Sequence, residues 1–338
     1  MRYDYIIIGG GISGIKAGHL LNKKNKILLL EKNNRLGGRI HTVTNGTEYI
    51  ELGAKWMRTG KKKQTIIHKV KGASNLVDYY MRLGFSIQQI EDINLKEAEN
   101  YGEHMNKLGL SNLYFDEYEE TMVKNGYYNK INWLIDFAYV LNTPVIKICR
   151  TKKRLYIIND MYITKSIIFA IPLTTLKNTF SYLLPMWKNK ILGKMKMGNI
   201  ISVALLFKKK WWKDDFEQKT HGNIVVINGG NVLYMHEFST TYMRLCKDYK
   251  NILDFFFKNA ESPKQTIYED WNKFGGGWTY HKPGLKLSEI KKLRIPYKNI
   301  HLIGEYTSMT RWGTTDGAEK SADYLVNYMI PIKNNISN

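Results

Sequence analysis

The chain has 338 residues, of which 43% are hydrophobic and 13% aromatic, and its formal net charge is +21. This apolar content excludes an intrinsically disordered chain, because it suffices for a sizeable core. The two cysteines, Cys149 and Cys246, cannot make a disulfide scaffold, and no apolar run has the length of a membrane span. The N-terminus shows no secretion signal, so we expect an intracellular protein.

The positive charge would suit a nucleic acid or another polyanion, because clustered cations bind phosphate backbones. However, lysine far outnumbers arginine, and asparagine, isoleucine and tyrosine are also frequent, as A/T-rich codons would produce. The lysines are scattered, with short runs only at Lys61–Lys63 and Lys208–Lys210. Nucleic acid therefore stays an alternative partner that the sequence does not favour.

The N-terminal segment indicates a strand, a glycine-rich turn and a helix. Tyr3–Ile8 is aromatic and β-branched, as in a buried parallel strand. The turn Gly9–Gly14 has the spacing G-x-G-x-x-G, and apolar residues at helical spacing follow it. A second apolar stretch, Ile27–Leu30, ends at Glu31. This order is typical of a dinucleotide-binding βαβ unit.

Each position of this motif has a physical role. Gly9 permits the tight turn, Gly11 lets the backbone approach a pyrophosphate at the positive end of the helix, and Gly14 lets the helix pack on the strand. Glu31 follows Gly11 at the distance where a carboxylate accepts hydrogen bonds from an adenosine ribose. We predict cofactor contacts for these residues and for Ser13 in the same turn.

A second glycine-rich loop follows Glu31 and favours FAD over a nicotinamide cofactor. Two adjacent glycines and an arginine would meet the same pyrophosphate from the other side, and a later Gly-Ala pair before a tryptophan suits a close pass under a flat ring. Nicotinamide enzymes do not carry this second loop. The cofactor residues predicted here are Lys32, Gly38, Arg39, Gly53, Ala54, Lys55 and Trp56.

These motifs resemble those of the flavin-containing amine oxidases, the family of monoamine and polyamine oxidases. The family repeats the patterns E-x(n)-G-G-R and D-x-G-x-x-W, which Glu31–Arg39 and the segment up to Trp56 resemble. The resemblance continues in order along the chain. The further similar segments are Gly126–Tyr128, Asn142–Val145, Ile167–Leu173, Met197–Trp212, Gly275–Gly284 and Ile303–Ala318.

The resemblance implies an α/β fold, with a Rossmann-like FAD-binding domain and an interleaved α+β substrate domain. The FAD-binding domain would comprise residues 1–58, 126–190 and 296–332, and the substrate domain residues 59–125 and 191–295. The chain is short for the family, mainly between Gly60 and Gly126. We therefore expect a reduced helical cap there, with a helix around Leu76–Leu83 and Asp116–Glu120 on a solvated helix face.

The resemblance also implies cofactor contacts in the rest of the chain. The backbone of Val145 would hold the adenine, and a helix starting within Gly313–Ala318 would face the flavin ring. The alternative is an ordinary helix start capped by Thr315 or Asp316. Because Gly277 stands where some members carry a flavin-linked cysteine, we expect non-covalent FAD. The cofactor residues implied here are Val145, Trp271, Gly304, Glu305, Thr315, Asp316 and Ala318.

Four residues are candidates for catalysis by the same resemblance. Ser202 stands where the family usually has a lysine that faces the flavin, so the reaction with oxygen is uncertain. Lys55 could supply a replacement cation, or could be a surface lysine. Trp278 would form one wall of an aromatic cage and Thr314 the opposite wall, although Trp278 could instead pack in a core.

The function that the resemblance implies is FAD-dependent oxidation of an amine. Hydride would pass from the carbon beside the nitrogen to flavin N5, water would hydrolyse the imine, and hydrogen peroxide would form if oxygen is the acceptor. One alternative is a dehydrogenase or desaturase with another acceptor. Another is a degenerate flavoprotein that serves as a polyanion-binding scaffold. The sequence shows no metal-ligand cluster.

Overall fold

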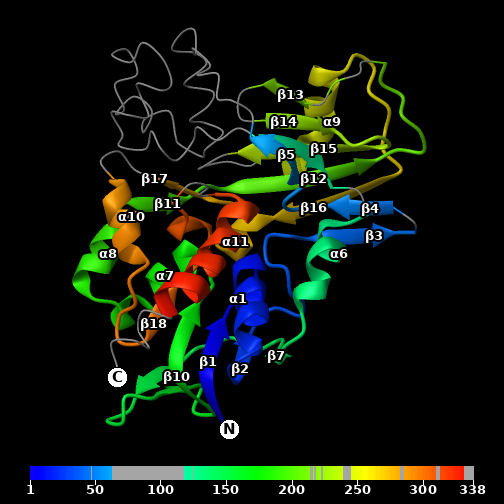
Figure 1. The fold of residues 1–338 in the computed structure, drawn as a ribbon. Coiled ribbons are helices and arrows are strands. Elements are labelled where there is room, and N and C mark those ends of the chain that lie inside the picture. The colour runs from blue at the N-terminus through cyan, green and yellow to red at the C-terminus, as the bar shows by residue number, and fades with distance from the viewer. Residues whose placement is uncertain are drawn as a thin grey trace.

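The computed structural model describes residues 1–46, 48–62, 118–123, 125–213, 216, 218–221, 224–238, 245–281, 285–309 and 313–330. The predicted helix around Leu76–Leu83 lies outside the described residues. The described part has two large sheets, a mainly parallel one near the N-terminus and an antiparallel one above it in Figure 1.

The first sheet has seven strands in the order β7-β2-β1-β10-β9-β8, with β18 also paired to β10. Strand β1 runs parallel to β2 and β10, β2 parallel to β7, and β10 parallel to β18, whereas β8 and β9 are antiparallel. The strands are β1 (Arg2–Ile8), β2 (Ile27–Leu30), β7 (Tyr139–Val140), β8 (Ile148–Arg150), β9 (Tyr156–Ile158), β10 (Tyr162–Phe169) and β18 (Ile300–Leu302).

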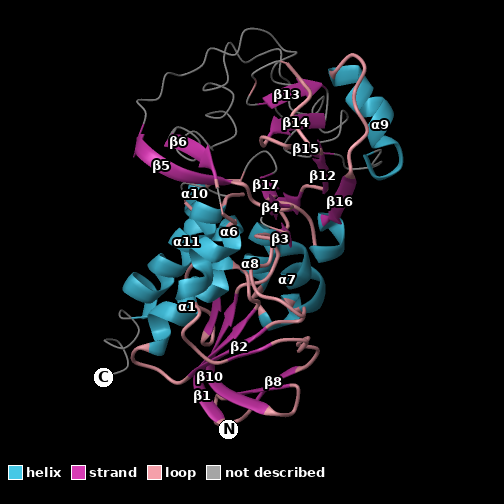
Figure 2. Cartoon of the chain, turned by 90° about the vertical axis from the view of Figure 1, so that its right-hand side faces the viewer, coloured by secondary structure: helices cyan, strands magenta, loops and turns pink. Residues whose placement is uncertain are grey.

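Helices cover both faces of this sheet because its central strands are apolar on both sides. Ile6 and Ile8 point into one core, with α7 (Leu173–Thr179), α8 (Met186–Leu192) and α10 (Leu287–Leu293). Ile7 points into the other core, with α1 (Ile12–Asn22) and α11 (Thr315–Tyr324), which continues into the π-helical turn η6 (Leu325–Met329). Figure 2 shows α1 and α7 on opposite sides of the sheet.

The second sheet is antiparallel, in the order β13-β14-β15-β12-β16. Ile201, Val203 and Leu205 of β12 pack with α9 (Leu245–Phe256). Ala204 and Leu206 point the opposite way, into a small core with Ile50 and Leu52. The strands are β12 (Ile200–Leu206), β13 (Gln218–His221), β14 (Ile224–Asn228), β15 (Val232–Phe238) and β16 (Gln265–Asp270).

Three two-stranded ribbons and several short helices connect the two sheets. Glu119 and Glu120, expected on a helix face, lie in a strand instead, because residues 118–122 pair with 56–62. The ribbons are β3 (Thr42–Asn45) with β4 (Glu48–Glu51), β5 (Trp56–Lys62) with β6 (Tyr118–Met122), and β11 (Met195–Met197) with β17 (Thr279–His281). The short helices are α6 (Tyr127–Ile131), η2 (Asn132–Leu134), η3 (Ser181–Leu183), η4 (Trp271–Phe274) and η5 (Glu305–Thr307).

The predicted α/β class and the Rossmann-like N-terminal unit are confirmed. The strands of the parallel sheet come from the ranges predicted for the FAD-binding domain, and the antiparallel sheet comes from 200–270. The division at the stated boundaries stays a prediction. Within the described residues, no helix combines the length and the apolar character needed to cross a membrane.

One buried lysine holds two helices of the parallel sheet together. Lys188 of α8 is almost fully buried, and its Nζ donates hydrogen bonds to the carbonyl oxygens of Leu293 (2.5 Å) and Ile295 (2.6 Å) at the end of α10. These carbonyls are among the groups that a helix C-terminus leaves without partners. Burial lowers the pKa of Lys188 to about 7.

We predict that this lysine makes the stability of the fold depend on pH. Between about pH 10 and about pH 7 the unfolded chain binds a proton on Lys188 that the folded chain does not, so the unfolding free energy falls as the pH falls. One pKa unit corresponds to about 1.4 kcal/mol, so the loss reaches a few kcal/mol. Urea unfolding at several pH values measures it, with Lys188→Met as the variant that lacks this contribution. An identical pH dependence in the two proteins would contradict the prediction.

Candidate active site

The turn between β1 and α1 is built around glycines that no other residue could replace. Gly9 has φ +106°, and a Cβ atom there would lie 2.6 Å from the carbonyl oxygen of Ala170. A Cβ atom at Gly14 would lie 2.1 Å from the carbonyl oxygen of Gly9. The helix therefore packs directly on the strand, as the motif predicts.

Gly11 differs from these two glycines because a Cβ atom there would meet no atom within 4 Å. Gly11 is also the N-cap of α1, and it gives the first turn no side-chain acceptor. The positive end of the helix, including the backbone of Ser13, thus begins beside open space. This cradle fits a pyrophosphate.

The second glycine loop packs against the first. Gly37 forms a parallel bridge with Gly11, and its N–H donates to the carbonyl oxygen of Gly10 at 2.8 Å. Gly38 has φ +58°, and a Cβ atom there would lie 3.0 Å from the Cα of Gly11. Arg35 holds this loop by donating to the carbonyl oxygens of Gly38 and Ile40. The two loops therefore face the same space.

Glu31 lies at the end of β2 and next to the first loop. Its buried carboxylate accepts hydrogen bonds from the N–H groups of Gly10 (2.6 Å) and Asn33 (2.9 Å). The N–H of Thr143 donates to the carbonyl oxygen of Glu31 at 2.8 Å, which brings the partly buried Val145 to this end of the sheet. Lys32 is exposed.

Arg39 joins four segments that lie far apart in the sequence. Its guanidinium donates to the carboxylate of Glu305 at 3.0 Å and to the carbonyl oxygen of Gly277 at 2.6 Å. Its own carbonyl oxygen accepts from Ala54 N–H at 3.0 Å. A Cβ atom at Gly53 would lie 2.0 Å from that oxygen, so this position requires glycine.

Glu305 and the start of α11 complete this end of the site. Thr279 Oγ1 and Gly313 N–H also donate to the buried carboxylate of Glu305, at 2.8 and 2.9 Å. Gly304 N–H donates to Ser321 Oγ at 2.9 Å and so ties η5 to α11. The N-cap of α11 is Thr314, which accepts from Gly317 N–H at 3.0 Å. The helix therefore starts within Gly313–Ala318, as predicted, and the alternative that Thr315 or Asp316 caps it is wrong.

Each of the remaining α11 residues predicted to touch the cofactor has a protein partner. Thr315 Oγ1 accepts from Tyr127 Oη at 2.9 Å, because α6 packs beside the helix start. Asp316 pairs with Lys320 one turn later, at 3.1 Å. Ala318 is buried between α11 and α1.

A buried polar cluster lies between β12 and the segment after β4. Ser202 Oγ is 2.8 Å from Nδ1 of His236, its register partner on β15. Trp271 Nε1 donates to Ser202 Oγ at 3.3 Å and to the carbonyl oxygen of Leu52 at 3.1 Å. Because Ser202 accepts from Trp271, its hydroxyl hydrogen can be donated to His236 Nδ1.

Lys55 is buried in the same cluster with 2% of its surface exposed, which excludes the surface alternative. Its Nζ donates to the carbonyl oxygens of Glu51 and Gly53 and lies 4.4 Å from the ring centroid of Tyr234. Burial lowers the pKa of Lys55 to about 7, although the nearby Glu51 opposes this shift. Burial and the charge of Lys55 lower the pKa of His236 well below its usual value.

Sequence reasoning missed His236 and Glu51. The carboxylate of Glu51 is buried, accepts from Thr42 Oγ1 (2.9 Å) and Tyr127 N–H (2.5 Å), and has its pKa raised by burial. Alternation along β15 could have placed His236 on the face of β12 that carries Ser202. Trp56, a predicted cofactor contact, packs beside Ile50 in the small core.

The structure also brings Trp278 close to Gly313, the residue before Thr314. Trp278 follows Gly277, the residue whose carbonyl oxygen Arg39 binds. A Cβ atom at Gly313, the residue before Thr314, would lie 3.5 Å from the Cβ of Trp278. Trp278 is half-buried and belongs to none of the four hydrophobic clusters found in the described residues. This placement does not favour the core-packing alternative.

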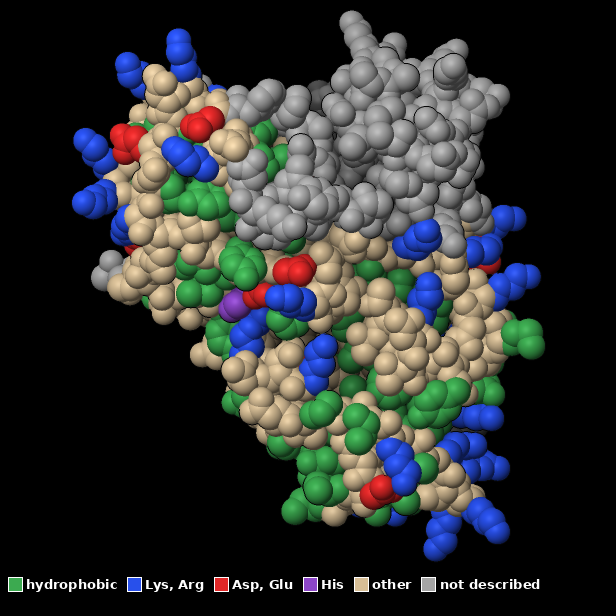
Figure 3. Space-filling view, turned by 180° about the vertical axis from the view of Figure 1, so that it is seen from behind, with side chains coloured by type: hydrophobic (Ala, Val, Ile, Leu, Met, Phe, Trp, Pro, Cys, Tyr) green, Lys and Arg blue, Asp and Glu red, His purple; other side chains and the backbone are tan. Residues whose placement is uncertain are grey.

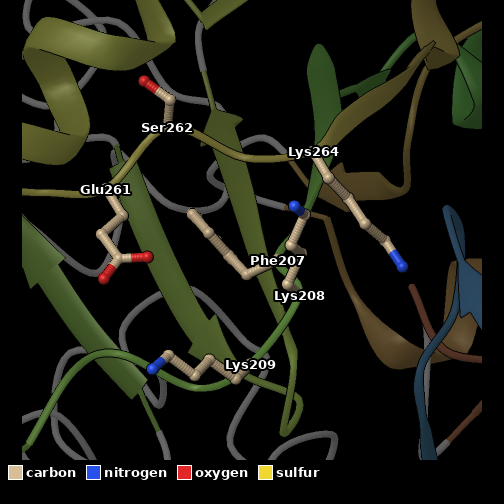
Figure 4. Close-up of a pocket in the computed structure, with 6 residues that line it drawn as sticks. All are labelled: Phe207, Lys208, Lys209, Glu261, Ser262 and Lys264. Atoms are coloured by element: carbon tan, nitrogen blue, oxygen red, sulfur yellow. The ribbon is translucent and has the colours of Figure 1, made fainter.

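Two surface hollows can be compared with this group of residues, one beside the loop that holds Asn33 and Arg35 and one away from the site. One, of about 580 Å³, lies between the loop after β2 and β16 and contains the His41–Glu269 pair at 2.7 Å. The other, of about 350 Å³, lies at the far end of β12 (Figure 4). The latter is lined by Phe207, Lys208, Lys209, Glu261, Ser262 and Lys264, none of them a predicted site residue.

Comparisons with known proteins agree with this geometry. The family model for flavin containing amine oxidoreductases matches residues 138–243 and 238–328, and a model for NAD(P)-binding Rossmann-like domains matches residues 7–70. Human flavin-containing amine oxidase B is 23% identical to this chain, over 97% of this chain and 87% of that protein. Polyamine oxidase 3 of Oryza sativa subsp. japonica is 23% identical, over 93% and 86%.

A solved structure of a putrescine oxidase double mutant, redesigned in its cofactor binding, has a similar fold. Its TM-score is 0.71 at 14% sequence identity, and the match covers 98% of this chain and 99% of that chain. Together these matches confirm the resemblance inferred from the motifs, the two-domain α/β fold and FAD as the cofactor.

We predict that Gly11→Ala separates cofactor binding from folding. The added methyl group meets no protein atom, so the stability of the FAD-free protein should change by less than about 0.5 kcal/mol. The methyl group fills the cradle, so FAD should bind at least about tenfold more weakly. Thermal melting and FAD titration measure the two effects. Gly14→Ala is the matched control, since its clash should cost ~1–3 kcal/mol of stability. If Gly11→Ala binds FAD as tightly as the unmodified chain, the cradle at Gly11 does not bind the cofactor.

Proposed function

The chain belongs to the flavin-containing amine oxidoreductase family, and we infer that its substrate is an aliphatic diamine or polyamine whose nitrogen lies against Trp278. The observation that carries this proposal is the bond from Arg39 to the carbonyl oxygen of Gly277. Because Trp278 follows Gly277, this bond supports a position of Trp278 near the proposed cofactor cradle. FAD-dependent amine oxidation is the activity of this family and of this chain.

The chain's own residues fit FAD in three places. The cradle at Gly11 would hold the pyrophosphate, Glu31 would accept hydrogen bonds from the ribose, and the segment Gly53–Lys55, where Ala54 N–H donates to the carbonyl oxygen of Arg39, would lie near the flavin. Bound FAD would supply the acceptor for two electrons and a hydrogen from the carbon beside the nitrogen. Gly277 offers no thiol, and the one cysteine whose side chain is described, Cys149, is exposed on β8, so we propose non-covalent binding.

Trp278 and Thr314 would select the amine. The face of an aromatic ring attracts a nitrogen that carries positive charge and excludes water from it. A threonine opposite the ring leaves a more polar and less enclosed wall than a second ring would. Such a site favours a long, polar amine over an aryl one. Among the relatives are a polyamine oxidase and a putrescine oxidase, whose names point to the same class.

Lys55 would supply the positive charge that Ser202 cannot. Ser202 is enclosed by Trp271 and His236, whereas the ammonium of Lys55 lies buried under the Gly53–Ala54 backbone. A cation buried there stabilises negative charge that develops nearby more strongly than it would in water. We propose that this charge supports reoxidation by oxygen. If oxygen does not reoxidise the flavin, that result would favour the alternative of a dehydrogenase with another electron acceptor.

The first test is anaerobic titration of the yellow protein with putrescine, spermidine and benzylamine. We expect putrescine or spermidine to bleach the visible flavin band faster than benzylamine. Trp278→Ala should slow the bleaching about tenfold or more, while Trp278→Phe keeps most of the rate because a ring remains. If no amine bleaches the band, the result would favour the alternative of a polyanion-binding scaffold. Binding to heparin that weakens steeply with salt would then support that role.

The second test concerns Lys55. We predict that Lys55→Met slows the return of flavin colour in air by on the order of tenfold, with a smaller effect on anaerobic bleaching. In the unmodified protein this rate should fall as the pH rises through about 7, because the amine loses its proton there. Lys152→Met, at an exposed lysine between β8 and β9, is the control and should keep both rates. An unchanged rate in air for Lys55→Met would contradict the role of this charge.

A further inference from the structure

Four large apolar side chains are exposed around the start of α8 and the end of α10. Met186 is 86% exposed, Tyr182 64%, Ile295 50% and Trp187 42%. Single exposed apolar residues need no explanation, but a cluster of them does. We call these four residues the α8–α10 patch.

The four residues share one rigid surface. Nζ of Lys188 donates to the backbone carbonyl oxygen of Ile295 and also lies 5.0 Å from the ring centroid of Trp187, so the backbone at Ile295 and the Trp187 ring are near the same amine. The side-chain amide of Asn189 donates to the carbonyl oxygen of Ser181 at 2.9 Å, which fixes η3 against α8. This bond places Tyr182 beside the start of α8, where Met186 lies.

The chain segments that carry the patch are rich in basic residues and poor in acidic ones. Residues 161–213 contain no aspartate or glutamate, and neither do residues 290–304. The carboxylate of Glu289, the acidic residue of α10, is bound by Lys194 at 2.8 Å. The exposed cations on these segments, close in sequence to the patch residues, are Lys190, Lys291, Lys292 and Lys298.

Figure 3 shows the setting of such a surface. At its right-hand edge, which corresponds to the left of Figure 1 where α8 lies, hydrophobic side chains protrude among lysine and arginine side chains. In Figure 1, α8 and α10 lie on that same side of the molecule.

From this combination we propose that the α8–α10 patch docks on a membrane surface that carries anionic lipids. Exposed tryptophan, tyrosine and methionine side chains enter the boundary between headgroups and acyl chains, and nearby lysines attract the lipid charge. A second copy of the chain would bring equal charges together. A nucleic acid would leave Met186 and Ile295 against a polar backbone.

The test is co-sedimentation of the FAD-loaded, full-length chain with two kinds of vesicle. One kind is phosphatidylcholine alone, and the other contains about one third phosphatidylserine. We expect binding to the anionic vesicles that weakens with added salt, and little binding to the neutral ones.

Two variants and two matched controls separate the parts of the proposal. Met186→Ser/Trp187→Ser should weaken vesicle binding at least about tenfold through the loss of apolar insertion. Lys291→Gln/Lys292→Gln should weaken it about fivefold for each lysine removed. The controls are Trp133→Ser, a tryptophan on η2 that is more exposed than Trp187, and Lys152→Gln/Lys153→Gln, an adjacent exposed pair elsewhere. Both controls should bind like the unmodified chain.

Four outcomes would overturn the proposal. They are no binding to anionic vesicles, equal binding to neutral vesicles, unchanged binding by Met186→Ser/Trp187→Ser, and equal losses in the controls. Analytical ultracentrifugation of the same proteins checks the rival occupant. If the unmodified chain is a dimer and only Met186→Ser/Trp187→Ser is a monomer, the patch is instead the contact with a second copy of the chain.

Discussion

The guanidinium of Arg39 is the contact on which the geometry of the site depends. Its side chain binds Glu305 and Gly277, and its backbone binds Ala54, so one residue sets the distance between the second glycine loop, the Gly53–Ala54 segment and the C-terminal motif. Glu305 is buried, and a buried carboxylate is stable only if it is paired and hydrogen-bonded. Loss of this arginine would therefore leave an uncompensated charge as well as three loose segments.

The polar cluster around Lys55 and His236 is a second place where charge is kept away from water. Apolar side chains at this position would make the fold more stable, because removing an amine and an imidazole from water costs free energy. The cluster lies where the antiparallel sheet meets the segment after β4, and its members come from both sides of that boundary. Polar groups that bond in only one arrangement favour a single packing of this segment on the sheet, whereas apolar groups would allow several.

The sequence predicts the features of the site that depend on local chain geometry. Some features can be predicted because each turn demands particular residues within a short span. They are the glycines at 9, 11 and 14, the acid at 31 and the paired loop at 37–39. Features that depend on contacts between segments far apart in the sequence could not be predicted in this way. Three features depend on the exact strand register or helix start: the burial of Lys55, the Ser202–His236 pair and the capping role of Thr314. An error of one residue in the predicted register or helix start would change each of them. The acidic run at Glu119 shows the same limit, since its strand is imposed by a partner at the other end of a long connection.

The position of β18 has a consequence for the order in which the molecule assembles. This strand completes the parallel sheet beside β10, and it comes from residues 300–302, whereas β1 at the centre of the sheet comes from the first residues of the chain. Contacts of such long sequence separation form late, because the closure entropy of the intervening chain must be overcome first. During synthesis the glycine cradle therefore emerges long before Glu305, its distant closing residue. A polypeptide that ends before this strand would lack Glu305, the partner of Arg39, so we expect FAD to bind only after residues 300–305 have been made.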